Sequence, residues 1–336
     1  MRTLTRRRAA FPLRRALSSR AVALGCDVAA YHRDGFTVPS WSLPPERLRL
    51  AQEALDRLLD ENKQVMPEQL VSAHLVGDGS GSNDGAVRGQ AQFLELASSQ
   101  EIADLAAACL GTDDVILWAC QIFCKPAGTG KSVPWHQDGQ VRACVPHALT
   151  AAAAHGMLRA SVGCTDRHMV SCDPSQYWPI EPLRAVTAWI ALDRSDDECG
   201  ALQYVPGTHA CEPVLVPHVQ RNDAGAAISY VADPALLPPA LLASARTLTL
   251  EPGQVSLHDA MVLHGSGPNT SSRRRAGVAA TFMPAECHFY RDRPTEGALK
   301  GGLTLDFSSR PLFVVKGRNR HPDNELVHDL VDRGCA

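Results

Sequence analysis

The sequence has no excess of charge of either sign and no long apolar run, and both absences narrow what the protein can do. Its 36 acidic and 33 basic side chains give a formal net charge of −3 over 336 residues. A chain so close to neutral gives no reason to expect nucleic acid or an anionic membrane surface as a partner. No stretch approaches the roughly 18 to 20 apolar residues that span a bilayer. We therefore expect neither a nucleic-acid partner nor a membrane span.

Ordered cysteine motifs are missing as well. The eleven cysteines are scattered, no Cys-x-x-Cys pair occurs, and the closest two are Cys120 and Cys124. A disulfide framework is typical of shorter secreted chains with an even number of cysteines. The pattern here favours reduced thiols in an intracellular protein.

The amino terminus is rich in arginine and has no acidic residue. Residues 1–20 hold seven arginines, and the first carboxylate of the chain is Asp27. Such a start is typical of an organelle transit peptide, with a disordered basic tail or an over-extended gene start as alternatives. We place residues 1–25 outside the fold and expect one domain over 26–325 and a tail over 326–336. The final "DRGCA" carries no peroxisomal signal, which leaves the mitochondrion or plastid, and otherwise the cytoplasm, as the expected location.

The order of expected elements indicates the fold class. Residues 44–65 and 99–111 carry the spacing or end signals of helices, and 28–41 predicts a short helix, a turn and a strand. From about residue 114 the pattern changes to short β-rich runs bounded by Gly, Pro and Asp. Helices followed by many strands predict a mainly β jelly roll or antiparallel barrel with flanking α-helices. The expected strands lie within 114–125, 185–193, 201–207, 246–259, 260–266 and 276–283.

A histidine and an aspartate stand two residues apart in "VPWHQDGQ" (133–140). Side chains i and i+2 of a strand emerge on the same face, so His136 and Asp138 can reach one point in a barrel interior. They would supply two ligands of the two-histidine, one-carboxylate triad that holds ferrous iron and leaves positions open. Alone, a His-x-Asp pair is more often part of a turn or a hydrogen-bond network. The metal hypothesis therefore requires a second histidine from a distant strand.

His264 is the candidate for that second histidine, because it closes the apolar run "AMVL" at the end of an expected inward-facing strand. His258 is a rival, although with Asp259 it fits a structural turn at a strand end better. Arg275 follows His264 after room for a turn, so the two could lie side by side on adjacent antiparallel strands. A guanidinium there can bind the far carboxylate of 2-oxoglutarate through two hydrogen bonds. Alternation places Arg274 on the opposite face.

Four blocks between about residues 118 and 283 read "IFCKPAGTGKSVPWHQDG", "YWPIEPLRAVTAWIALD", "CGALQYVPGTH" and "HDAMVLHGSGPNTSSRRRAG". In this order they resemble the phytanoyl-CoA dioxygenase family of iron(II)- and 2-oxoglutarate-dependent oxygenases. The resemblance implies the fold of that family, a double-stranded β-helix of the cupin-like jelly-roll type. This implication agrees with the strand-rich pattern.

The resemblance also implies roles for individual residues. By position, His136, Asp138 and His264 match the iron ligands, and Arg275 rather than the two arginines before it matches the partner of the 2-oxoglutarate carboxylate. Without the resemblance, Trp189 would be interpreted as an ordinary core tryptophan, and Gln121 and Lys125 as solvent-facing polar residues. The further cosubstrate contacts that the resemblance implies are Ser266 through its hydroxyl, Trp189 and Gln121 along the pocket, and Lys125 as charge at its mouth.

The implied reaction uses ferrous iron, 2-oxoglutarate and O2, with ascorbate as a supporting reductant. It hydroxylates an aliphatic carbon of a small molecule or acyl-CoA and releases succinate and CO2. Halogenating relatives carry a small residue in place of the carboxylate, so Asp138 favours hydroxylation over halogenation. Epoxidation, desaturation and ring formation are alternative outcomes that the sequence does not exclude. The loop 74–85 and the segment after "PGTH" are the expected substrate walls. The alternative function is a non-catalytic jelly roll that binds a ligand, which would require a broken triad or the loss of Arg275.

Residues 141–176 interrupt the resemblance. In the family the aromatic–proline block follows His-x-Asp almost at once, and "HQDGQ" and "YWPIEP" would join directly without this segment. Every codon for Val141 begins with GT, and one codon for Gln176 is CAG. A spliceosomal intron begins with GT and commonly ends in CAG. The segment is 36 codons long, so its retention would keep the reading frame. We interpret the segment as a retained intron. If it is translated and displaces Asp138, it would inactivate the protein. A lid loop over the active site is the rival interpretation, and a zinc site within the segment matches no familiar ligand spacing.

Overall fold

The computed structural model describes residues 19–76, 87–139, 178–211, 216, 218–221, 223–292 and 307–326. Several expectations fall outside these residues, namely those for 1–18, for most of the loop 74–85, for the segment 141–176 and for 327–336. The fold begins earlier than expected. Helix α1 (Ser19–Ala23) packs on α5 (Gln100–Leu110), and its Ala21 is fully buried. The buried core thus includes α1, which precedes the expected start of the domain at residue 26.

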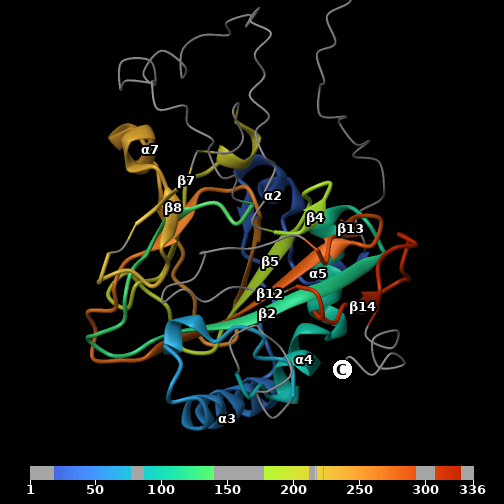
Figure 1. Ribbon diagram of the computed structural model, residues 1–336, viewed down its shortest axis with the longest axis horizontal. Coiled ribbons are helices and arrows are strands. Elements are labelled where there is room, and N and C mark those ends of the chain that lie inside the picture. Colours follow the sequence, from blue (N-terminus) through green and yellow to red (C-terminus); the bar gives the residue numbers. More distant parts are fainter. Residues whose placement is uncertain are drawn as a thin grey trace, which may run out of the picture.

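The prediction of a mainly β jelly roll with flanking helices is confirmed (Figure 1). The larger antiparallel sheet has the strand order β1-β10-β5-β12-β2-β14, and the smaller has the order β3-β11-β6-β9. Two further pairs, β13-β4 and β7-β8, lie outside these sheets. The strands are β1 (Phe36–Thr37), β2 (Val115–Lys125), β3 (Val133–His136), β4 (Ile180–Glu181), β5 (Val186–Ala191), β6 (Leu202–Tyr204), β7 (His218–Gln220), β8 (Tyr230–Ala232), β9 (Arg246–Thr247), β10 (Val255–Asp259), β11 (His264–Ser266), β12 (Arg275–Pro284), β13 (His288–Phe289) and β14 (Phe313–Lys316).

The central strands of the larger sheet are covered on both faces. All ten residues of β12 and all six of β5 are buried, which explains why their sequences are apolar or small without a polar alternation. Alternate residues still divide the faces, with Val278 and Ala280 of β12 packing on the helices and Ala279 and Thr281 facing the cavity between the sheets. The inner face thus has room for a site, while the outer face forms the main core.

Helices α1 to α5 cover the outer face of the larger sheet, and in Figure 1 α3 and α4 lie along the lower side of β2 and β12. Helix α3 (Pro45–Glu61) confirms the helix expected within 44–65, and it buries Leu55 and Leu58 against the sheet. Helix α5 confirms the prediction for 99–111, ending at Gly111 in the left-handed conformation that its φ of 70° shows. The remaining helices are α2 (Val28–Asp34), α4 (Ala91–Ala97), α7 (Pro239–Leu242) and the 3₁₀ turns η1 (Pro67–Gln69), η2 (Thr208–Ala210) and η3 (Pro234–Leu236).

Among the residues that the structure describes, no helix combines the length and the apolar character that crossing a membrane requires.

Candidate metal centre

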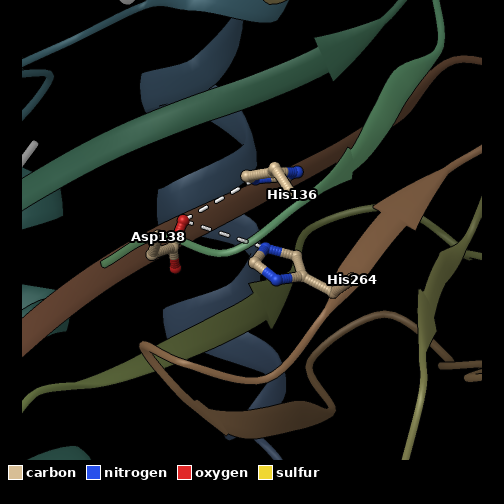
Figure 2. Close-up of side chains that lie close together, drawn as sticks. All are labelled: His136, Asp138 and His264. Carbon is tan, nitrogen blue, oxygen red and sulfur yellow. Dashed lines mark ion pairs between the residues drawn. The ribbon is translucent and has the colours of Figure 1, made fainter. Parts of the chain in front are cut away.

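Two histidines and one aspartate from distant parts of the chain converge between the two sheets. His136 is the last residue of β3 and His264 is the first of β11, and their Cα atoms are directly paired across these antiparallel strands. Their ring centroids are 4.2 Å apart. Oδ1 of Asp138 lies 3.7 Å from Nε2 of His136 and 3.8 Å from Nε2 of His264 (Figure 2). One nitrogen or oxygen from each residue lies within 4.8 Å of the others, which suits a single metal ion.

The secondary structure around Asp138 and His264 differs from the expectation in two respects. Strand β3 ends at His136, so Asp138 belongs to the turn that follows and does not share the strand with it. The apolar run before His264 is a turn and not a strand, because Asp259 accepts a hydrogen bond from the N–H of Met261 and redirects the chain. His264 therefore begins its strand instead of closing one.

The backbone fixes the orientation of both imidazoles. Nδ1 of His136 lies 2.8 Å from the carbonyl oxygen of Pro134, and Nδ1 of His264 lies 3.0 Å from that of Val262. A carbonyl oxygen can only accept, so each Nδ1 carries the proton and each Nε2 keeps a free lone pair. Metal-binding histidines in proteins are commonly held in this way.

Burial sets the charge of the three residues. It lowers the pKa of His136, and it lowers that of His264 to about 3, with the nearby His136 adding to the effect. Burial by itself would raise the pKa of Asp138, but the surrounding imidazoles of His264, His258 and His136 lower it to about 2. At neutral pH the group presents two neutral imidazoles and one carboxylate, a donor set for a divalent cation.

Arg275 lies at the other end of the same cavity. Its side chain is 1% exposed, and its guanidinium lies over the ring of Trp189, 4.7 Å from the ring centroid. Its Nε donates a long hydrogen bond of 3.4 Å to Oγ of Ser195, while Nη2 has no partner among the described residues. Burial lowers the pKa of Arg275 to about 10, so it stays charged at neutral pH. A buried cation without a carboxylate partner in the described chain calls for an anionic ligand.

The neighbouring arginines have other roles. Arg274 directly precedes β12 and does not line the cavity, in agreement with the opposite face that alternation predicted, and it pairs with Asp193 at 2.9 Å and with Asp56 at 2.6 Å. Arg273 pairs with Asp196 at 2.8 Å and is 42% exposed along its side chain. Of these three arginines, only Arg275 reaches the cavity.

One spatial expectation about Arg275 is wrong. It does not lie beside His264 on an adjacent strand, since β12 pairs with β2 and β5 whereas β11 pairs with β3 and β6. The two residues instead line the same cavity from the two facing sheets. The residues that line this cavity are Gln121, Phe123, Val133, His136, Asp138, Trp178, Thr187, Trp189, Leu202, His258, His264, Ser266, Arg275, Ala279 and Thr281.

Lys125 is the one cosubstrate candidate that does not line the cavity. It is fully buried rather than at a solvent-facing mouth, and it is paired in register with Arg275 across β2 and β12. Its Nζ donates to Oγ of Ser266 at 2.6 Å and to the carbonyl oxygen of Gly267. Burial lowers the pKa of Lys125 to about 6, and the charge of Arg275 adds to this effect. Lys125 therefore acts on the cavity through the Ser266 hydroxyl.

A glycine makes room for Trp189 in this arrangement. Gly277 lies opposite Ala191 on β5, and a Cβ atom built on it would lie 2.2 Å from Cζ2 of Trp189. Any side chain at this position would displace the indole on which the Arg275 guanidinium rests. The small residue is thus required by close approach of the ring and not by backbone conformation.

His258 is a cavity residue that the sequence pattern placed in a structural turn. It lies instead within β10, is 3% exposed, and places Nε2 3.5 Å from Oδ2 of Asp138. Its Nδ1 lies 3.0 Å from the hydroxyl of Tyr204. The alternation of "VSLHD" could have predicted this position, because Val255 and Leu257 face the helices and His258 must then face inward.

Known proteins resemble this chain in sequence. A family model described as phytanoyl-CoA dioxygenase matches residues 31–166 and 165–277, well over half of the chain. The peroxisomal phytanoyl-CoA dioxygenase of Bos taurus is 30% identical over 128 residues, which cover 37% of this chain and 36% of that protein. A probable phytanoyl-CoA dioxygenase of Caenorhabditis elegans is 29% identical over 132 residues, or 38% of each. The matched part thus spans little more than a third of these relatives.

Solved structures share the fold over most of the chain. The apo form of the non-heme monooxygenase ThoJ superposes with a TM-score of 0.55 at 19% identity, covering 92% of each chain. The epimerase SnoN, in complex with Fe3+, α-ketoglutarate and nogalamycin RO, gives a TM-score of 0.53 at 20% identity, covering 85% of this chain and 96% of that one. At these identities the likeness shows the jelly-roll fold alone.

Proposed function

The chain belongs to the phytanoyl-CoA dioxygenase family, and we propose that it is an Fe(II)- and 2-oxoglutarate-dependent dioxygenase. It would hydroxylate an aliphatic carbon of a small molecule or acyl-CoA and release succinate and CO2. The observation that carries the proposal is that one cavity holds both a two-histidine, one-carboxylate donor set and the buried Nη2 of Arg275, which has no partner within the described residues.

The donor set fits ferrous iron. Two imidazole nitrogens and one carboxylate oxygen with open positions are the ligands of non-heme iron(II) oxygenases, whereas an all-oxygen set would favour magnesium or calcium. Nε2 of His136, Nε2 of His264 and Oδ1 of Asp138 would hold the metal. When bound, the iron supplies the reduction of O2 coupled to oxidation of 2-oxoglutarate.

Arg275 fits the far carboxylate of 2-oxoglutarate. Its planar guanidinium can pair with a carboxylate through two parallel hydrogen bonds, and the desolvation of Nη2 would then be compensated. Ser266 would donate its hydroxyl to the same carboxylate, a role supported by its place in the cavity lining and by the hydrogen bond that it accepts from Lys125. Trp189 would hold the guanidinium through its ring, and Gln121 would contribute a polar group to the cavity lining.

The chain's own groups would also keep water out of the reaction. The iron ligands and Arg275 are all buried or nearly so, and their neighbours in the cavity are mostly apolar or aromatic, Trp178, Phe123 and Leu202 among them. Ion pairs and hydrogen bonds are stronger in such an environment than in water. Asp138 retains its carboxylate as a ligand, which favours hydroxylation over halogenation of the substrate.

Succinate formation from 2-oxoglutarate tests the proposal even before a substrate is identified. We expect purified protein to form succinate slowly in the presence of Fe(II), O2 and 2-oxoglutarate, and faster when an accepted acyl-CoA or free acid from a screen is added. His136→Ala should abolish this formation, and His32→Ala, at an exposed histidine that does not line the cavity, should leave it unchanged. No succinate formation with iron bound would favour the non-catalytic ligand-binding alternative, and succinate formation that does not need iron would contradict the proposed mechanism.

A further inference from the structure

A second group of metal-binding side chains lies outside the cavity. His288 on β13 faces His321 and Asp323, which come from the segment after β14. The two imidazole rings are stacked, with centroids 4.5 Å apart and planes within 5° of parallel. Nδ1 of His321 lies 3.9 Å from Oδ2 of Asp323, and one nitrogen or oxygen from each of the three residues lies within 4.8 Å of the others. The spacing His-x-Asp of the iron site recurs here at residues 321 and 323.

The segment that carries two of these ligands is held firmly against the strand that carries the third. Asn324, which is 3% exposed, accepts from the N–H of Phe289 at 2.8 Å and donates to the carbonyl oxygen of Cys287 at 2.8 Å. These two hydrogen bonds bracket His288 on β13. Asn319 adds a bond from its side chain to the carbonyl oxygen of Asn324 at 3.1 Å. The backbone of the segment that carries His321 and Asp323 is thus fixed next to His288 through a buried asparagine.

We propose that His288, His321 and Asp323 form a second metal site, for a divalent first-row transition ion of the zinc type. Two imidazoles and one carboxylate select such ions over magnesium or calcium, which prefer oxygen ligands. The side chain of His321 is 28% exposed and that of Asp323 is 72% exposed, so an ion can enter from solvent and complete its coordination with water. The ligand atoms lie within 4.8 Å of one another, and binding of the ion would require the side chains to rotate so that their lone pairs converge.

The ion would tie the C-terminal part of the described chain to the wall behind the cavity. Phe289, next to His288, packs on Trp118 with ring centroids 5.8 Å apart, and Trp118 packs edge-on against Trp178 at 5.0 Å. Trp178 lines the candidate iron cavity. The second site would therefore stabilise this aromatic wall without contacting any group that binds iron or 2-oxoglutarate.

Counting bound zinc in full-length protein tests the proposal. After treatment with a chelator and titration with Zn2+, we expect two equivalents per chain by calorimetry and elemental analysis. The His136→Ala/His264→Ala double variant should lose one equivalent and retain the other, and Zn2+ should still raise its thermal unfolding midpoint. His321→Ala should lose the other equivalent, and His32→Ala should keep both. Adding Mg2+ in place of Zn2+ should give no binding at the second site.

Asp323→Asn provides a variant that preserves shape at an exposed position and should fold normally. It should lower the affinity for the second zinc ion by at least roughly 10- to 100-fold, which is what the loss of an outer-shell partner typically costs. The proposal would be overturned if the unaltered protein and His321→Ala bound the same number of zinc equivalents, whether that number is one or two. Succinate formation should be unchanged in His321→Ala, so the failure of this site and the failure of the proposed function can be told apart.

Discussion

His258 places Nε2 3.5 Å from Oδ2 of Asp138, while Oδ1 of the same carboxylate faces His136 and His264. Nδ1 of His258 is in turn 3.0 Å from the hydroxyl of Tyr204. If the tyrosine donates to Nδ1, the neutral imidazole carries its proton on Nε2 and donates to Asp138. The carboxylate is then oriented with one oxygen held by His258 and the other turned toward the metal.

From this relationship we predict that His258→Phe lowers the affinity for Fe(II) by about 10- to 100-fold, the usual cost of losing a group that orients a ligand. Tyr204→Phe should give a smaller loss in the same direction, because it removes only the partner of His258. Iron binding can be measured by anaerobic titration, and succinate formation at saturating iron should largely recover. Unchanged iron affinity in both variants would contradict an orienting role.

Arg275→Met should weaken the binding of 2-oxoglutarate and at the same time raise the stability of the ligand-free protein. Loss of the charge partner should weaken 2-oxoglutarate binding by about 2–5 kcal/mol, whereas the protein without 2-oxoglutarate should unfold at a higher temperature, because a buried uncompensated charge is gone. Thermal unfolding with and without 2-oxoglutarate measures both effects. Arg274→Gln, which alters the outward-facing neighbour, should leave 2-oxoglutarate binding intact. A lower unfolding temperature for Arg275→Met in the absence of the ligand would disagree with this account of the cavity.

Stability should fall with acid below the ordinary histidine pKa of about 6.5. Burial lowers the pKa of His74 to about 3, with Arg310 adding to the effect, so this side chain stays neutral in the folded protein while the unfolded chain takes up a proton. The unfolded state then binds more protons, and the free energy of unfolding decreases by about 1.4 kcal/mol per pH unit between roughly pH 6.5 and 3. Urea unfolding at pH 7, 6 and 5 measures the slope, which His74→Gln should reduce by that amount. An equal slope in the variant would show that other groups dominate.

Removal of residues 141–176 should preserve folding and succinate formation. Both flanks are anchored, since the N–H of Gly139 donates to the carbonyl oxygen of Ala260 at 2.9 Å and Trp178 packs on Trp118. The two segments matched by the family model also meet inside this region. Sequencing of mature transcripts would test the intron interpretation directly, and uninterrupted coding sequence across the region would reject it. If the shortened chain is insoluble or inactive while the full chain works, the segment belongs to the fold.

Much of the architecture could be predicted because it depends on local pattern. The leucine spacing of α3, the end signals of α5 and the strand-like runs of β2, β5 and β12 all act through neighbouring residues. α4 was missed because its seven residues have neither a side-chain cap nor a glycine at the end. The run before His264 was misassigned because a hydrogen bond to Asp259 overrides its apolar character.

The sequence by itself determined the residue types of the candidate site and, through alternation, that Arg275 reaches the cavity while Arg274, just before β12, does not. Only the tertiary structure decided that β11 pairs with β3 rather than with β12, that Lys125 is buried beneath Ser266, and that His258 contacts the free oxygen of Asp138. Side-chain periodicity is a property of a single strand and can be read along the chain. Which strands pair, and which faces meet across a cavity, depends on packing between residues more than a hundred positions apart, and no local pattern encodes it.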